Sequence, residues 1–173
     1  MARCMAAAGY GGGVCFDAVS ESAERLATEL GWRAGGRAEA AACDIVCTIT
    51  PGAEPVITAA DLRPGQHINA LGADGPGKAE LTPDALARCL LFCDEWEQSC
   101  HGGELASAVR AGTVKRGDVT ELGWLLTGVS QPRRDDEITL FDSTGLAIQD
   151  LAICVELMRK LRDGTIEAPE ISI

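Results

Sequence analysis

The sequence predicts an α/β protein built on a mostly parallel β-sheet. Continuous apolar runs rich in β-branched residues, such as CDIVCTIT at residues 43–50, are typical of strands that are buried on both faces. Segments with helical spacing of apolar residues separate these runs along the chain. Strands that alternate with helices in this way indicate a parallel sheet. We therefore expect one α/β core rather than a helical bundle or a β-sandwich.

Composition narrows the classes of function. The chain has 173 residues, 46% of them hydrophobic, which is enough for a sizeable core. Its net charge of −11 argues against nucleic acid and anionic membrane surfaces as partners, because both bind basic faces. No apolar run is long enough to span a bilayer, and no signal peptide is visible. The eight cysteines lie singly in apolar runs, so we expect reduced thiols in a cytoplasmic protein.

The first predicted elements are a helix, a strand and a second helix. The alanine-rich run Ala2–Ala8 favours helix. GVCFD at residues 13–17 is a short apolar run closed by an acid, which indicates a strand. Residues 20–30 form an amphipathic helical pattern, in which Ser20 is placed as the N-cap and Gly31 as the stop.

Four glycines in the stretch Gly9–Gly13 resemble a phosphate-binding loop. A dinucleotide-binding loop, however, follows a strand and opens a helix, because the helix N-terminus must point at the pyrophosphate. Here the order is reversed, with a helix before the glycines and a strand after them. We therefore predict a helix stop and a turn at this stretch.

The rest of the chain continues the alternation. Strands are predicted at residues 43–50, 66–71 and 90–94, and residues 137–145 are predicted as a strand that breaks into a turn. Helices are predicted at residues 102–112, 118–128 and 146–161. Polar residues gather where these strands end, and ligands of parallel sheets bind at the carboxyl ends of strands. The residues at these ends are Asp17, Thr48, Thr50, Asp74, Ser143 and Thr144. The pattern outlines a ligand site.

Each acidic or hydroxyl candidate has an ordinary alternative. Asp17 is placed either to bind a ribose or to cap the following helix. Asp74, close to Lys78, is either a general acid or base beside a cofactor or part of a surface loop rich in turn formers. Ser143 and Thr144 lie at the expected start of a helix, where they either bind an anion or belong to a simple N-cap formed by Asp142 or Ser143.

The metal-binding residue types form no strong motif. Cys89, Cys93, Cys100 and His101 are close in sequence, but no CxxC pair occurs, and Cys93 lies in a buried strand pattern. His67 lies within a predicted strand and is expected to be structural. We expect no metal ion in the site.

Four segments together resemble the ornithine cyclodeaminase/mu-crystallin family, which includes an alanine dehydrogenase. They are DIVCTITPGAEPVI, LRPGQHINALGADGPGKAEL, DEWEQSCHGGEL and ITLFDSTGLAIQDLA, in this order. The resemblance implies a Rossmann-type NAD-binding domain at residues 1–137. It also implies that the strand and helix of residues 138–173 return to a substrate and dimerisation domain, in a protein that is a homodimer in its intact form.

The resemblance also implies roles for single residues. Asp74 matches the catalytic aspartate of the family. The matched cofactor contacts are Asp17, Thr48, Leu71, Gly72, Ala73, Asp74, Lys78 and Ser143, and Thr144 matches a substrate contact. A carboxylate at Asp17 favours NAD over NADP, because it repels the extra ribose phosphate.

The implied chemistry is that of an ornithine cyclodeaminase, which passes a hydride from L-ornithine to NAD and back and releases proline and ammonia. The alternatives are an alanine or imino-acid dehydrogenase and a non-catalytic cofactor binder like mu-crystallin.

Some segments of the family have no match in these residues. They are the first Rossmann strand, its glycine loop, and the lysine and arginine that bind the substrate carboxylate. We therefore expect the sheet to have unpaired edges and the family activity not to reside in these 173 residues alone.

Overall fold

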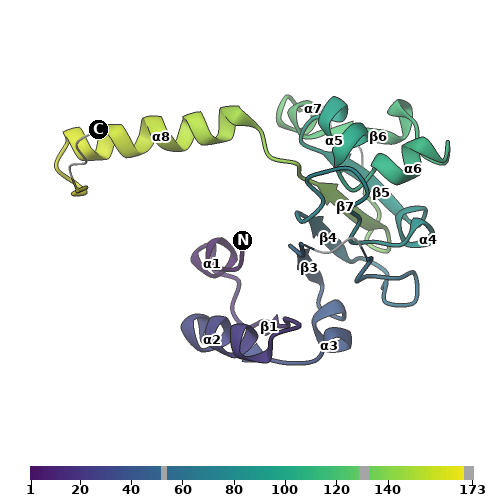
Figure 1. Ribbon diagram of the computed structural model, residues 1–173, viewed down its shortest axis with the longest axis horizontal. Coiled ribbons are helices and arrows are strands. Elements are labelled where there is room, and N and C mark those ends of the chain that lie inside the picture. Colours follow the sequence, from purple (N-terminus) through teal and green to yellow (C-terminus); the bar gives the residue numbers. More distant parts are fainter. Residues whose placement is uncertain (52–53, 129–132, 170–173) are drawn as a thin grey trace.

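The computed structural model describes residues 1–51, 54–128 and 133–169, and its centre is a five-stranded parallel sheet (Figure 1). The strand order is β3-β4-β7-β5-β6, and every neighbouring pair is parallel. The strands are β3 (Ile45–Thr48), β4 (His67–Ala70), β5 (Cys89–Cys93), β6 (Val119–Glu121) and β7 (Ile138–Asp142). The predicted α/β fold class with a parallel sheet is confirmed.

A second, smaller sheet lies at the N-terminal side. It pairs β1 (Val14–Cys15) with β2 (Arg33–Ala34) in parallel, and α2 (Ser20–Leu30) connects the two strands. The side chains of Cys15, Ala23 and Ala27 are buried between α2 and this sheet. The strand–helix–strand unit therefore has a small core of its own.

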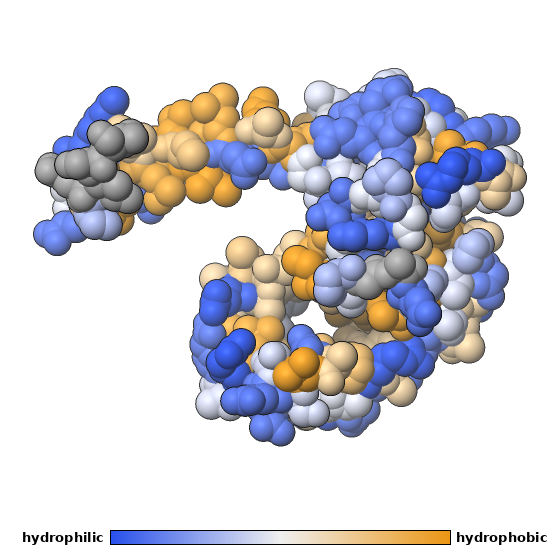
Figure 2. Space-filling view, in the orientation of Figure 1, coloured by the Kyte–Doolittle hydropathy of each residue, from blue (hydrophilic) through white to orange (hydrophobic). Residues whose placement is uncertain are grey.

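The two sheets do not join. Among the described residues, β1 pairs only with β2, and β3 pairs only with β4. Figure 1 shows β1 and β3 apart, and Figure 2 shows an opening between the N-terminal segment and the larger sheet. In the described part of the chain, one edge of β1 and one edge of β3 thus lack a strand partner, as the sequence predicts.

Short helices surround the larger sheet. They are α3 (Arg37–Ala41), α4 (Pro83–Leu86), α5 (Trp96–Gly102), α6 (Ala106–Arg110), the 3-10 turn Arg116–Asp118 and α7 (Leu122–Leu126). The first helix, α1 (Ala2–Ala7), lies instead in the N-terminal unit, where Arg3 forms an ion pair with Glu29 of α2 (Figure 1). Figure 1 shows α5, α6 and α7 gathered around β5 and β6. No helix in the described ranges is long and apolar enough to cross a membrane.

The main core lies between the sheet and these helices. Ile68 on β4 and Leu140 on β7 are 1% and 0% exposed, and they are joined by Leu81, Leu86 and Leu105 from the surrounding segments. β4, β7 and β5 are the inner strands of the sheet, and burial on both faces explains their continuous apolar runs. The core therefore fixes the strands whose ends carry the predicted site.

Two local predictions are wrong. Residues 118–128 are not one helix, because residues 119–121 add to the sheet as β6 and pair with Leu91–Cys93. The chance to bury Val119 beside β5 outweighs the helical pattern of this short segment. Ser20 is the first residue of α2 and not its N-cap, whereas Gly31 ends that helix in the left-handed conformation as predicted.

The last element, α8 (Ala147–Arg162), extends away from the body of the molecule (Figure 1). Apolar side chains cover much of its surface in Figure 2 and remain exposed, among them Ile148, Leu151, Val155 and Met158. A helix that is apolar on its exposed face usually buries that face against another element. The chain leaves the sheet after β7, and the predicted division between residues 137 and 138 stays a prediction.

Replacing Leu140 tests the importance of the inner strands. We expect Leu140→Ala to lower the free energy of unfolding by about 2–5 kcal/mol, because it leaves a cavity beside a side chain that is fully buried. Leu126 is 80% exposed, so Leu126→Ala is the matched control and should change stability by less than about 0.5 kcal/mol. Urea denaturation followed by circular dichroism measures both. Equal losses in the two variants would contradict this core.

Candidate functional site

The strands β3, β4, β5 and β7 end at one edge of the parallel sheet, the carboxyl edge, which holds the C-terminal ends of the strands. Most of the predicted site residues lie there. Thr48 is the last residue of β3 and pairs in register with Ala70, the last residue of β4. Ala70 in turn pairs with Asp142 at the end of β7. The predicted loop Leu71–Asp74 and the residues Ser143 and Thr144 follow directly.

A buried carboxylate, Glu80, holds the ends of β3 and β4 together. Its Oε2 accepts hydrogen bonds from Thr48 Oγ1 at 2.6 Å and from the backbone N–H groups of Leu71 and Gly72 at 3.1 and 2.8 Å. Its Oε1 accepts from the Thr50 backbone N–H at 2.6 Å. Glu80 is only 1% exposed, so these donors replace water around the carboxylate. Leu71 and Gly72 are thus fixed beside Thr48.

A second buried acid, Glu104, binds the backbone at Glu80. Its two carboxylate oxygens accept hydrogen bonds from the backbone N–H groups of Glu80 and Leu81, at 2.8 and 2.7 Å. Burial raises the pKa of Glu104 to about 7, and burial also raises the pKa of nearby Asp142 to about 6. Both acids are 0% exposed. The carboxyl edge is therefore built over acids that resist ionisation.

A third buried acid, Asp94, anchors the segment after β7. Its Oδ2 accepts hydrogen bonds from Ser143 Oγ and from the backbone N–H groups of Thr144 and Gly145, at 2.9 to 3.0 Å. Ser143 and Thr144 therefore lie in a turn, and α8 begins only at Ala147 with no side-chain cap. The predicted break of the strand into a turn at these residues is confirmed. The interpretation that they lie at the start of the helix itself is wrong, because their donors bind Asp94 and α8 begins three residues after Thr144.

Two adjacent glycines bring the loop of Asp74 and the turn of Thr144 to the same place. A Cβ on Gly102 would lie 3.7 Å from the Cα of Gly75, and a Cβ on Gly103 would lie 2.7 Å from Cγ2 of Thr144. The turn of Thr144 can approach this close only because Gly103 has no side chain, whereas 3.7 Å at Gly102 is an ordinary contact distance. The loop after β4 and the turn after β7 consequently border one site.

Asp74 lies at the rim of this site. Its carboxylate is an ion pair with Lys78, with Oδ1 2.6 Å from Nζ, and its side chain is 67% exposed. The hydrogen bond from Lys78 lowers the pKa of Asp74, so this carboxylate is ionised at neutral pH. The preceding residue, Ala73, is 1% exposed and packs inward. The loop thus has a fixed base and a charged, accessible tip.

Two hydroxyl groups of the site have a fixed donor direction in their hydrogen bonds. Thr48 and Ser143 both donate their hydrogen to a buried carboxylate, Glu80 and Asp94 respectively. Each oxygen is therefore left as an acceptor for a ligand. The amide N–H and ribose O–H groups of a nicotinamide nucleotide are donors of the matching kind, so this edge fits such a cofactor.

Asp17 is not brought to this edge. It follows β1 in the smaller sheet, and its Oδ1 accepts a hydrogen bond from the backbone N–H of Val19 at 2.7 Å. Val19 precedes α2, so Asp17 serves at the start of that helix. A ribose contact by this exposed carboxylate stays a prediction.

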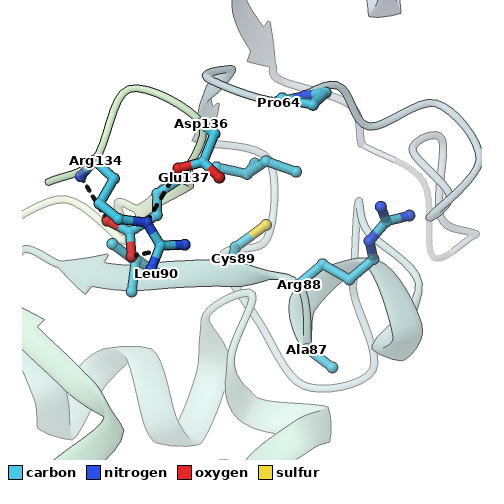
Figure 3. A pocket seen from close by; sticks show the side chains of 9 residues that line it. Pro64, Ala87, Arg88, Cys89, Leu90, Arg134, Asp136 and Glu137 are labelled. Atoms are coloured by element: carbon cyan, nitrogen blue, oxygen red, sulfur yellow. Dashed lines mark hydrogen bonds and ion pairs between the residues drawn. The ribbon is translucent and has the colours of Figure 1, made fainter.

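A cavity lies at the opposite edge of the sheet. It has a volume of about 400 Å³ and is lined by the first residues of β5 and β7 together with Arg88, Arg134 and Asp136 (Figure 3). Arg134 already pairs with Asp136 and Glu137. Cys89 at its floor is a thiol, since burial raises its pKa to about 11. The cavity presents no reactive group and lies away from the site predicted by the strand ends.

The cysteines and histidines have mainly structural surroundings. All eight cysteines are free. His67 Nδ1 lies 2.8 Å from Thr139 Oγ1 and Nε2 lies 3.2 Å from Asn69 Oδ1, as expected for a structural histidine. The donor atoms of Glu97, Cys100 and His101 lie within 4.8 Å of one another, but His101 Nδ1 lies 2.6 Å from the backbone oxygen of Glu97. A metal there would have to displace that contact.

The parallel strand order is that of a Rossmann-type α/β fold, in which ligands bind at the carboxyl ends of the strands. The family model of the ornithine cyclodeaminase/mu-crystallin family matches residues 17–164. The chain belongs to this family.

Individual relatives give the same result. The alanine dehydrogenase of Archaeoglobus fulgidus is 47% identical over 117 residues, which cover 66% of this chain and 36% of that protein. The ornithine cyclodeaminase of Agrobacterium tumefaciens is 34% identical over 123 residues, covering 69% and 33%. The solved structure of an archaeal alanine dehydrogenase dimer with bound NAD has a TM-score of 0.84 at 34% identity, and covers 94% of this chain and 53% of that one.

These coverages show how much of each relative this chain matches. It spans about a third of the length of these curated relatives and about half of the solved structure. The relatives are dehydrogenases and cyclodeaminases by name. The predicted family and the Rossmann-type fold are confirmed, whereas the specific ornithine reaction stays a prediction.

Sequence reasoning missed the acids that build the site. Glu80, Glu104 and Asp94 have no predicted role, although each lies in a segment that carries the family resemblance. Of the three, only Asp94 directly follows an apolar strand run, so its position was an available signal, whereas Glu80 and Glu104 lie in glycine-containing segments away from the strands. What no pattern reveals is that backbone N–H groups from distant segments converge on them.

Glu104 should make stability depend on pH. The folded protein keeps the Glu104 proton up to a pH of about 7, against an ordinary value of 4.5. The folded state therefore binds more protons than the unfolded state between these values, and the free energy of unfolding falls as pH rises, by at most about 1.4 kcal/mol per pH unit for one group.

Glu104→Gln removes this titration and should flatten the fall between pH 5 and 7, while Asp142 keeps its own smaller contribution. Urea denaturation across this range measures the slope for both proteins. Parallel slopes in the parent and the variant would contradict a buried, protonated Glu104.

Proposed function

We propose that this chain supplies the cofactor-binding part and the proton-transfer residue of an NAD-dependent enzyme that acts on an α-amino acid or its imine. The observation that carries the proposal is the Asp74–Lys78 pair at the rim of the carboxyl edge, where parallel sheets bind nucleotides. NAD, when bound, would accept or supply the hydride at the α-carbon. Membership of a family with NAD-bound relatives supports this choice of cofactor.

In this proposal the residues of the chain have separate tasks. Thr48 and Ser143 accept hydrogen bonds from the cofactor, because their own hydrogens are held by Glu80 and Asp94. Asp74 is ionised and accessible, so it can take a proton from the substrate ammonium or from water. Lys78 keeps that carboxylate charged and directs it. Thr144, beside Gly103, borders the space for the substrate.

Among the finer possibilities, an amino-acid dehydrogenase is favoured over a cyclodeaminase. Identity to the alanine dehydrogenase relative is 47%, against 34% to the ornithine cyclodeaminase. Both reactions share the redox step, and only a cyclodeaminase goes on to close a ring. A homodimer, in which the exposed apolar face of α8 is covered, fits the dimeric alanine dehydrogenase relative.

Asp74→Asn tests the proton-transfer role. The chain is placed in the alanine dehydrogenase of Archaeoglobus fulgidus in exchange for the aligned segment. We expect the variant to lose about 10²–10⁴-fold in turnover, because Asn cannot accept the proton. Affinity for NADH, measured by fluorescence, should stay within about threefold of the parent. Products from alanine and from ornithine, pyruvate or proline, separate the two reactions.

Asp84→Asn, at an exposed position of α4, is the matched control and should leave turnover unchanged. If Asp74→Asn keeps more than a tenth of the turnover, Asp74 is not the proton-transfer group. Binding of NADH without turnover in either protein would favour the non-catalytic binder.

A further inference from the structure

The loop that carries Asp74 is closed by a side chain at its own far end. Glu80 reaches back over eight residues, and its Oε2 lies 2.8 Å from the Gly72 backbone N–H. Asp74 and Lys78 form their ion pair within the segment so enclosed. The two ends of the segment are thus fastened by one carboxylate, and its tip carries the charged pair.

The same carboxylate ties the loop to the neighbouring strand. Thr48 Oγ1 and the Thr50 backbone N–H donate to it from the end of β3, while Leu71 and Gly72 donate from the end of β4. All four partners are donors, and three of them are backbone groups that cannot reverse their role. Only a carboxylate, with acceptor oxygens on both sides, satisfies them together.

The space around this contact is filled. A Cβ at Gly72 would overlap with Glu80 Oε1 and with the backbone of Thr50, so the loop has no room to shift at this point. Glu104 in turn fixes the backbone N–H of Glu80 at 2.8 Å. A series of contacts therefore leads from the buried Glu104 through Glu80 to the base of the loop.

We propose that Glu80 is a positioning residue, which sets the place of Asp74 and of the Thr48 hydroxyl by clamping residues 71–72 against the end of β3. It lies 1% exposed beneath the loop and acts through these neighbours without a contact of its own to substrate. This inference rests on the proposed function for its catalytic meaning. The clamp itself can be tested without any turnover.

The test compares the 173-residue chain with Glu80→Gln by amide hydrogen exchange. Gln offers one acceptor oxygen and turns an NH₂ group toward backbone donors, so it cannot hold both Thr50 and the Leu71–Gly72 pair. We expect exchange at Thr50 and Gly72, whose N–H groups donate to Glu80, to rise at least tenfold. The Leu71 N–H also donates to the Thr48 backbone carbonyl at 3.0 Å, so its exchange should rise less. Exchange at Ile68, in the core of β4, should change less than twofold.

The second readout is the pKa of Asp74 from its carboxyl NMR signal. Removing the negative charge of Glu80 would by itself lower this pKa further. Loosening the loop weakens the pair with Lys78 and raises the pKa toward its ordinary value. The sign of the change therefore separates positioning from simple charge removal, and we expect a rise.

Two further variants complete the test. Glu80→Asp keeps the charge but shortens the reach by one methylene, and we expect the same loss of protection; it also replaces Glu80→Gln if that variant does not fold. Glu97→Gln, an exposed carboxylate on α5, is the matched control and should change neither readout.

The proposal is overturned if protection at Thr50 and Gly72 is kept, if Ile68 loses protection to the same extent, or if the Asp74 pKa falls or stays constant. Asp74→Asn should leave the Thr50 and Gly72 amides protected. A failed proton-transfer role would thus show in turnover alone, and a failed clamp would show in exchange alone.

Discussion

The carboxyl edge of this sheet depends on the hydrogen bonding of buried carboxylates. Glu80, Glu104 and Asp94 are each less than 10% exposed, and their partners are backbone N–H groups and hydroxyls from other segments. A buried carboxyl group is stable only when hydrogen-bond partners replace its water, so each acid requires distant segments to converge on it. The turns after β3, β4 and β7 take their shape from this requirement. The site is consequently arranged by acids that the ligand would not touch.

This arrangement separates two kinds of acid. The buried acids hold backbone, and burial raises the pKa of Glu104 and Asp142. Asp74 stands at the rim with an ion-pair partner that lowers its pKa, which leaves an ionised, accessible base. Acids whose surroundings push their pKa values apart in this way are typical of active sites. In the proposed enzyme the exposed acid transfers a proton, and the buried acids hold the backbone segments in place.

Much of the fold could be predicted from the sequence, because buried parallel strands are continuous apolar runs and therefore visible. β3, β4 and β7 fall within predicted runs, and β5 begins one residue before its predicted run. β6 was hidden in a helical pattern, since only the neighbouring β5 makes its three residues a strand. Asp74, Lys78 and Ser143 were found through a family resemblance. Glu80 and Asp94 were not, because their roles come from contacts across 8 to 51 residues of sequence.

The central claim is that a nicotinamide nucleotide binds at the carboxyl edge. There the ends of the strands meet the loop of Leu71–Asp74 and the turn of Ser143. The most direct measurement is an NADH titration of the chain followed by backbone amide NMR shifts. The account predicts shifts at Thr48, Leu71, Asp74 and Ser143, with none at Cys89 and Arg134 around the opposite cavity. A titration that shifts the opposite edge, or leaves the carboxyl edge unchanged at saturating NADH, would contradict it.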